Sequence, residues 1–376
     1  MTNSRDLKAQ TESLVGRLRR RQVTGSFSVS LATAFLLRSV ISTTRWTDVD
    51  TLIKLVKNVG RKLVQAQPSE LAVGNIVRHV LRVIRDASND EATEASFMEH
   101  AEDKNLFTSQ SHSVFKQSTS LLDYSAKDSS ARSAGFYTSS SSMINLLGDN
   151  GLRQPPNIIQ EINEMINELE NMYVNIWDQA MEHIHTNEII MTLGSSKTVE
   201  GFLKAAAKKR KFSVVVAETS PRYLGHDLAL SLCQVGIDTT VISDSAIFAV
   251  MSRVNKVILG THAVLANGGL IAISGTRLMA AAAKHHSTPV VVCMGLYKLS
   301  PLFLYDEDSF NDLESPENVL SFDEGDLVDK ATILNPYYDY VSPELVDLYI
   351  TNTGGHPPSY LYRLINENYD PEDTVI

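Results

Sequence analysis

The sequence predicts an α/β protein in which an N-terminal helical domain is followed by a Rossmann-like parallel-sheet domain. Over the first 87 residues apolar positions recur at spacings of three and four, which is typical of amphipathic helices. From residue 187 to the end, short runs of β-branched residues alternate with helix-like segments, which is typical of a parallel sheet covered by helices. A serine-rich stretch separates these two halves.

The N-terminal domain is expected to span residues 1–87 and to contain four helices. The last of them has the clearest pattern, begins just after Pro68, and presents one apolar face made of Leu71, Val73, Ile76, Val77, Val80, Leu81 and Ile84. A basic run occurs near the start, at Arg17 and residues 19–21. It has no aromatic residues between its arginines, so a solvated helix face explains it better than a nucleic-acid patch.

Between residues 88 and 150 the apolar periodicity fades, and serine, aspartate and glutamate accumulate. Such a segment buries too little apolar surface to offset the entropy of its chain, so we expect a mobile insertion. Residues 151–186 then return to a helical pattern with regularly spaced isoleucine, methionine and leucine. They predict a long helix that connects the two halves.

The C-terminal domain is expected to span residues 187–376. Its apolar, β-branched runs predict strands at residues 189–191, 214–216, 239–242, 257–259 and 290–292. Ligands gather at the carboxyl ends of the strands in such sheets, so the loops after these strands are the candidate functional positions.

Polar residues follow several of the predicted strands. Glu218, Asp244 and His262 each follow a strand and could converge as acid and base groups, although polar residues at strand ends are common in α/β domains. Asp244 could equally cap the helix that follows it. The loop with Gly194 and Ser195 precedes a helix, so its serines could bind a phosphate or serve as ordinary helix caps.

Composition excludes several classes of protein. The 376 residues carry a net charge of −10, which argues against a general nucleic-acid binder. No apolar stretch approaches the roughly 20 residues that span a bilayer, and the N-terminus lacks the apolar core of a secretory signal. Cys233 is expected in the core of a helix and Cys293 in a buried strand, and two cysteines fit a reducing compartment. The histidines lack metal-ligand spacing. We therefore expect a soluble, cytosolic protein without a metal.

Several segments resemble the initiation factor two-B family, most densely its beta subunits. They are residues 187–203 (NEIIMTLGSSKTVEGFL), 242–260 (ISDSAIFAVMSRVNKVILG), 283–289 (AKHHSTP), 297–301 and 354–364. The family contains the alpha, beta and delta subunits of this eukaryotic translation factor and two sugar-phosphate isomerases, which act on methylthioribose-1-phosphate and ribose-1,5-bisphosphate. The resemblance implies an N-terminal helical domain joined to a Rossmann-like domain.

The resemblance also implies a sugar-phosphate pocket that has lost its catalytic groups. The isomerases use a cysteine after one strand and an aspartate after a later one, and the matching positions here are Gly194 and His262. The other matching pocket positions are Ser195, Glu218, Asp244, Asn267, Gly268, Gly275 and Thr276. We therefore expect no catalytic residue and no cofactor. An active isomerase is the alternative, but it needs a compensating nucleophile. A third hypothesis is a pocket that retains a sugar phosphate or nucleotide as an effector.

The function implied by the resemblance is that of a regulatory, non-catalytic subunit of the guanine-nucleotide exchange factor for the tRNA-delivering GTPase. The implied partners are the alpha, gamma, delta and epsilon subunits of the same factor, with delta the closest and the exchange chemistry in epsilon. The N-terminal helices would face the alpha subunit of the GTPase, phosphorylated or not. The segment with His185 and Asn187 would lie at a central interface with delta. No direct nucleic-acid or membrane partner is expected.

Overall fold

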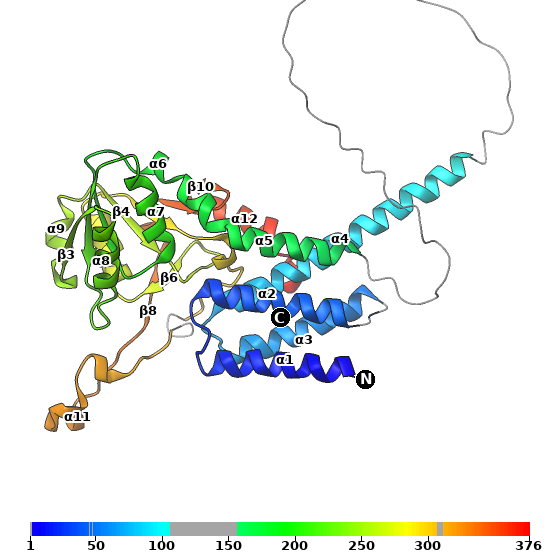
Figure 1. The fold of residues 1–376 in the computed structure, drawn as a ribbon, viewed down its shortest axis with the longest axis horizontal. Coiled ribbons are helices and arrows are strands. Elements are labelled where there is room, and N and C mark those ends of the chain that lie inside the picture. The colour runs from blue at the N-terminus through cyan, green and yellow to red at the C-terminus, as the bar shows by residue number, and fades with distance from the viewer. Residues whose placement is uncertain (1, 45, 47, 106–155, 307–310) are drawn as a thin grey trace, which may run out of the picture. The chain divides into compact units, whose positions relative to one another are not determined.

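The computed structural model describes residues 2–44, 46, 48–105, 156–306 and 311–376 (Figure 1). The chain forms two compact units, residues 1–87 with 155–376, and residues 88–154. The predicted serine-rich insertion lies outside the described residues from residue 106 onward. The domain boundary predicted at residue 87 falls inside helix α4 (Leu71–Asn105), and the division into domains stays a prediction.

Four helices open the chain, as the apolar spacing predicts. They are α1 (Thr2–Arg19), α2 (Ser26–Thr43), α3 (Val49–Ala66) and α4. In α3 the buried side chains recur with helical periodicity at Leu52, Val56 and Leu63, so one stripe of the helix faces its neighbours. Figure 1 shows α1, α2 and α3 gathered at one end of the unit.

Helix α2 has the length and composition of a short membrane span. Its 18 residues have a mean hydropathy of 1.3, whereas no apolar stretch that approaches the length of a membrane span was expected. Half of this helix is buried inside the protein, and Arg38 donates a hydrogen bond of 3.0 Å to Asn163 on α5. The apolar character of α2 is therefore explained by packing in the core of the helical region.

The predicted connecting helix is α5 (Pro156–Asp178), and the short α6 (Ala180–His183) leads from it to the sheet. Trp177 near the end of α5 donates its indole N–H to the backbone oxygen of Thr198, at 3.1 Å. This contact ties α5 to α7 (Lys197–Ala207), the first helix of the sheet region.

The main sheet has seven strands in the order β10-β9-β7-β4-β1-β2-β3, and all neighbours are parallel except β10 and β9. The five predicted strands are β1 (Ile189–Leu193), β2 (Ser213–Ala217), β3 (Asp238–Ile242), β4 (Lys256–Gly260) and β7 (Val290–Cys293). The hairpin of β9 (Leu348–Thr351) and β10 (Gly354–His356) completes one edge. The α/β fold is thus confirmed, with an antiparallel strand added at this edge.

A second, antiparallel sheet was not predicted. It pairs β5 (Ala263–Val264), β6 (Leu270–Ile273) and β8 (Tyr338–Val341) in that order. Its strands have only two to four residues, which is too short for a periodic pattern to stand out in the sequence.

Two apolar cores lie on the two faces of the main sheet. One contains Ile190 of β1 together with buried residues of α5, α7 and α8 (Leu224–Gln234), and it continues into α2, α3 and α4. The other contains Met191 with residues of α9 (Ile247–Met251), α10 (Thr276–His285) and α12 (Leu361–Asn368). Because Ile190 and Met191 point to opposite faces, one strand contributes to both cores. The N-terminal helices and the sheet thus share a continuous core.

The two cysteines lie in different environments. Cys293 is buried at the end of β7, as predicted, and burial raises the pKa of its thiol. Cys233 was predicted in the core but is exposed. The buried face of α8 is formed by Leu228, Ala229 and Leu232, and the residue after Leu232 is turned about 100° away from that face.

Candidate functional site

The candidate site lies at the carboxyl edge of the central strands. The neighbours β4, β1, β2 and β3 are parallel, so their following loops meet at one edge. The register pairs Leu193 with Ala217, and Ala217 with Ile242. This places Gly194, Glu218 and the loop of Asp244 beside one another.

Thr219 links three of these loops. Its hydroxyl oxygen accepts the backbone N–H of Gly194 at 2.9 Å, and the hydroxyl donates to the carbonyl of Ala217 at 3.2 Å. The carboxylate of Asp244 accepts the N–H groups of Thr219 and Ser220, at 3.0 and 2.6 Å. Asp244 therefore does not cap its own helix, and its charge satisfies backbone donors of the neighbouring loop.

Gly194 has a backbone reason to be a glycine. Its φ of 72° lies in the left-handed region, and a Cβ built on it would lie 3.3 Å from the side chain of Ile273. A side chain at this position would therefore combine backbone strain with a tight contact. The backbone of Glu218 joins neighbouring segments at this edge. Its N–H donates to the carbonyl of Ile242, and its carbonyl accepts the N–H of Gly225.

The N-terminus of α10 is occupied by a carboxylate of the same chain. Asp339 on β8 accepts the N–H of Gly275 at 2.7 Å and that of Arg277 at 3.2 Å. Free N–H groups at a helix N-terminus are a ready anion site. Here Asp339 takes the position of an anion, while the hydroxyl of Thr276 donates to the backbone oxygen of Ile273.

His262 faces the N-terminal helices. Its Nδ1 lies 3.2 Å from the hydroxyl oxygens of both Ser26 and Tyr338, and its Nε2 lies 3.2 Å from the carbonyl oxygen of Ser69. The rings of His262 and Tyr338 pack with centroids 4.5 Å apart. The polar contacts of His262 thus go to Ser26, Ser69 and Tyr338, whereas those of Asp244 go to the loop after β2. The predicted convergence of Glu218, Asp244 and His262 as acid and base groups is therefore not formed.

Two further ionisable side chains, Glu70 and Lys298, lie near His262 and its neighbour Thr261. Glu70 is buried, and its Oε1 is 3.6 Å from Nε2 of His262 and has no hydrogen-bond partner among the described residues. Lys298 donates from its ammonium to the carbonyl of Thr261 at 2.7 Å. Burial lowers the pKa of Lys298 to about 8, although the charge of Glu70 opposes that shift.

The remaining predicted pocket residues are spread over other places. Ser195 is exposed, and its neighbour Ser196 caps α7 by accepting the N–H of Val199, which supports the capping interpretation of this loop. Asn267 and Gly268 lie in the turn between β5 and β6. There Asn267 donates to the hydroxyl of Tyr340 at 2.8 Å and accepts the N–H of Gly269. Their contacts shape a hairpin turn.

His185 and Asn187 lie at the opposite, amino edge of the sheet, just before β1. Both side chains are exposed. The ring of His185 is 3.2 Å from the guanidinium of Arg210, and Asn187 has a left-handed backbone with φ of 66°. They are thus accessible from outside this chain, and no contact in the structure tests their predicted role at an interface.

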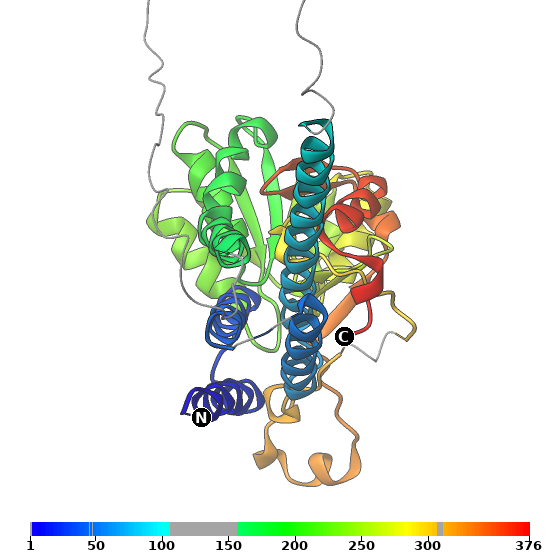
Figure 2. The same cartoon turned by 90° about the vertical axis from the view of Figure 1, so that its right-hand side faces the viewer.

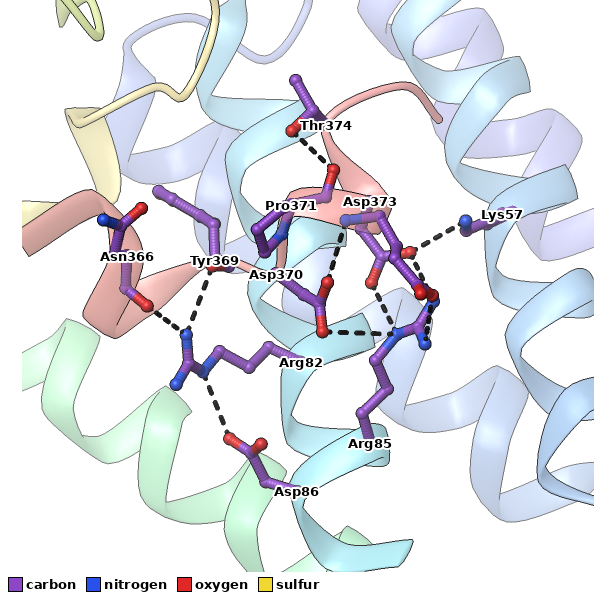
Figure 3. Close-up of polar contacts among 11 residues, drawn as sticks. Lys57, Arg82, Arg85, Asp86, Asn366, Tyr369, Asp370, Pro371, Asp373 and Thr374 are labelled. Carbon is purple, nitrogen blue, oxygen red and sulfur yellow. Dashed lines mark hydrogen bonds and ion pairs between the residues drawn. The ribbon is translucent and has the colours of Figure 1, made fainter. Parts of the chain in front are cut away.

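A charged cluster joins the C-terminal tail to α3 and α4 (Figure 3), and it was not predicted from the sequence. Asp373, whose side chain is fully buried, accepts two hydrogen bonds from Arg85, at 3.0 and 3.1 Å, and pairs with Lys57 at 2.8 Å. Burial alone would raise the pKa of Asp373, but the hydrogen bonds from Arg85 and Lys57 outweigh it and hold this pKa below its usual value. We call this contact the tail clasp.

Two more arginines of α4 extend the tail clasp. Arg78 donates to the carbonyl of Thr374 at 3.2 and 3.0 Å, and Arg82 donates to the carbonyls of Asn366 and Tyr369. With Arg85 these residues recur every three or four positions, so they share one face of α4. The spacing is visible in the sequence, but its partners lie almost 300 residues further along the chain.

No group of three or more His, Cys, Asp or Glu side chains suited to a metal ion occurs within the described ranges. At the carboxyl edge, the side chains of Thr219, Asp244 and Asp339 bind other groups of this chain. The arrangement stabilises loops and helix ends.

Comparisons with known proteins agree with this fold. Residues 22–358 match the Initiation factor 2 subunit family. Translation initiation factor eIF2B subunit beta of Schizosaccharomyces pombe is 49% identical over 384 aligned residues, covering 97% of this chain and 96% of that protein. The crystal structure of eIF2B beta from Chaetomium thermophilum superposes with a TM-score of 0.73 at 32% identity, covering 99% of this chain and 96% of the other. A chain of the tetrameric eIF2B-beta2-delta2 complex from the same fungus gives 0.67 at 29%, covering 96% and 95%.

The fold and its edge thus define a protein with N-terminal helices and a mostly parallel sheet, in which the carboxylates of Asp244 and Asp339 bind backbone N–H groups of the same chain. The chain belongs to the initiation factor 2 subunit family. Its predicted resemblance to the beta subunits of eIF2B is confirmed over nearly the full length.

Proposed function

We propose that this chain is a regulatory, non-catalytic subunit of the guanine-nucleotide exchange factor that acts on the tRNA-delivering GTPase of translation initiation. It would occupy the beta position beside the alpha, gamma, delta and epsilon subunits, in the cytosol. It would help to bind the alpha subunit of the GTPase and respond to its phosphorylation by differential binding.

The observation that carries the non-catalytic part is the internal use of two carboxylates at the carboxyl edge, those of Asp244 and Asp339. Asp244 accepts two backbone N–H groups and Asp339 accepts two more. A general acid or base must reach a substrate proton, and an incoming phosphate needs free donors. With Gly194 at the position of the isomerases' cysteine, these engaged groups favour a binding subunit over an isomerase.

The free edge of the sheet supports pairing with a delta-type subunit. Strand β3 is an edge strand, and Val241 on it is exposed. Leu230 and Val235 of the adjacent α8 segment and Phe248 of α9 are exposed as well. Exposed apolar residues beside the unpaired edge of a sheet are typical of an association surface. We propose that this edge, together with the loop of His185 and Asn187, contributes to the contact with delta.

The N-terminal helices carry a groove of about 630 Å³ between α1 and α2. It is lined by apolar and polar side chains, among them Gln10, Ser13, Arg17 and Phe35. The nearby Arg19 and Arg20 add positive charge to this end. Together they support the proposal that these helices face the GTPase's alpha subunit.

The test is to tag this chain in cells and to determine the composition of the purified complex by native mass spectrometry. We expect four further exchange-factor subunits in fixed ratio. Recovery of a lone homodimer would contradict the proposal. So would appreciable ketose formation when the purified chain is incubated with methylthioribose-1-phosphate or ribose-1,5-bisphosphate.

A further inference from the structure

The segment between η2 (Leu296–Lys298) and β8 contains an arm, residues 311–336, that lies outside the two cores. It has three short helical turns, η4 (Pro316–Asn318), η5 (Phe322–Glu324) and α11 (Asp326–Lys330). Among its described side chains, Asn335 is the buried one, and none belongs to an apolar core cluster. Figures 1 and 2 show the arm, in orange, standing away from the sheet in both views.

The base of the arm is fixed to the rest of the chain. Asp312 accepts hydrogen bonds from Arg21 and Ser69, both at 2.8 Å. Glu314 pairs with Arg222 at 3.1 Å, and the guanidinium of Arg222 lies over the ring of Tyr337. The arm is therefore anchored to the helical region and to the loop after β2. Anchoring the base restricts the arm, which lowers the entropy lost on binding.

The arm exposes large apolar side chains. Leu313, Val319, Phe322, Leu327 and Leu334 are between 50% and 68% exposed. Single exposed apolar residues are ordinary, but five within 22 residues form a concentration that is typical of a contact surface. The short turns of the arm leave these residues exposed, so they are available to a partner surface.

The charge of the arm selects the kind of surface. Residues 315–334 contain five acidic residues, Glu317, Asp323, Glu324, Asp326 and Asp329, and one basic residue, Lys330, which gives a net charge of −4. Nucleic-acid phosphates and anionic lipid surfaces attract positive charge, so both would repel this arm. A protein surface with an apolar pocket ringed by lysine and arginine complements both its charge and its apolar residues.

We propose that the arm docks on a different polypeptide of the exchange-factor assembly, in an apolar pocket ringed by lysine and arginine. Phe322 and Leu327 enter the pocket, and the acidic residues pair with its rim. The inference rests on the proposed function in taking the partner from that assembly.

The test places a photoreactive amino acid at position 322 or 327 in the five-subunit assembly, with Tyr362 on α12 as an exposed control position. We expect positions 322 and 327 to crosslink to one other subunit, at a peptide containing lysine or arginine, and position 362 not to reach that peptide. An intact assembly without such crosslinks, or with crosslinks only to a second copy of this chain, overturns the arm proposal and leaves the proposed function standing. Failure of the wild-type assembly to form overturns both.

A paired variant measures the contribution of the arm. F322S combined with L327S should speed the dissociation of the crosslinked subunit about tenfold or more, because a buried aromatic or aliphatic anchor dominates such contacts. The unfolding temperature of the isolated chain should not change, since both residues lie outside the core. T332A, at an exposed position of the same arm, is the control. Unchanged dissociation in the double variant contradicts the proposal.

Discussion

Two aspartates at the carboxyl edge stabilise backbone groups, although residues of this type at strand ends suggest catalysis. Asp244 holds the loop after β2 through two N–H groups, and Asp339 holds the first turn of α10 through two others. Charge-assisted bonds of this kind are stronger than neutral ones, and a negative charge near a helix N-terminus is favourable. At the residue scale, a carboxylate after a strand therefore has to be assigned by its partners.

Replacing Asp339 tests this assignment. Asp339→Ala leaves the N–H groups of Gly275 and Arg277 without their carboxylate, so it should lower the free energy of unfolding by about 1–3 kcal/mol. Asp339→Asn, which keeps an acceptor without the charge, should cost less. Urea unfolding of both variants is the measurement, with Glu168→Ala at an exposed position in the middle of α5 as control. An Asp339→Ala protein as stable as wild type would contradict the assignment.

Gly194 gives a second prediction at this scale. Gly194→Ala should destabilise the chain by about 1–2 kcal/mol for the left-handed backbone, and further for the contact with Ile273. Gly236→Ala is a matched control, because Gly236 has φ of 85° and no atom within 4 Å of an added Cβ. Equal losses of unfolding free energy in the two variants would show that the Ile273 contact contributes nothing.

The exposed loop before β1 gives a third prediction. If His185 contributes to the contact with a delta-type subunit, His185→Ala should weaken that pairing about fivefold and leave the unfolding temperature unchanged, because the side chain is exposed. Affinity measured by titration calorimetry decides, with the exposed Asn175→Ala on α5 as control. Equal affinities for the wild type and His185→Ala would remove this loop from the interface.

At the scale of elements, the tail clasp fastens the last residues of the chain to α3 and α4. Asp373 has no exposed side-chain area and two cationic partners, whereas its neighbour Glu372 pairs with the same Arg85 at 2.9 Å but is largely exposed. Removing one partner of a buried pair is costly, whereas exposed pairs contribute little. The two acids therefore differ in effect although they contact the same arginine.

Asp373→Asn should lower the free energy of unfolding by about 2–4 kcal/mol near neutral pH, and Glu372→Gln by less than about 1 kcal/mol. The pKa of Asp373 is lowered in the folded protein, so its stabilisation is complete above the ordinary pKa of about 4 and is lost as the pH falls through the lower folded value. The stability difference between wild type and Asp373→Asn should thus shrink below about pH 4. Denaturant unfolding between pH 3 and 7 measures it, and a difference that is constant with pH would contradict the clasp.

The elements also show how much of the structure the sequence predicts. Runs such as Val214, Val215 and Val216 predicted their strands because β-branched apolar residues signal buried strands locally. Strands β5, β6 and β8 were missed because they are short, and Cys233 was misplaced by one helical position. The tail clasp was missed because Arg85 and Asp373 meet through tertiary packing alone. In the candidate site, the sequence predicted which loops gather at the edge, but not that Asp244 and Asp339 would bind backbone groups.

At the scale of the whole molecule, the N-terminal helices and one face of the sheet share a continuous apolar core. Its buried residues run from Leu37 of α2 through Ile166 of α5 to Ile190 of β1. Together with the tail clasp, this core makes the helical region and the sheet one packed body. In the proposed function, a GTPase subunit bound at the helices would therefore act on subunits bound at the sheet edge through a packed interior.

The central claim is that this chain regulates exchange and performs no chemistry of its own. The most direct measurement is nucleotide release from the GTPase in the presence of the purified chain alone, or of the five-subunit assembly, with the GTPase's alpha subunit phosphorylated or not. The account predicts no acceleration by the chain alone, acceleration by the assembly, and loss of that acceleration on phosphorylation. Release accelerated by the isolated chain, or an assembly without this chain that remains equally sensitive to phosphorylation, would contradict it.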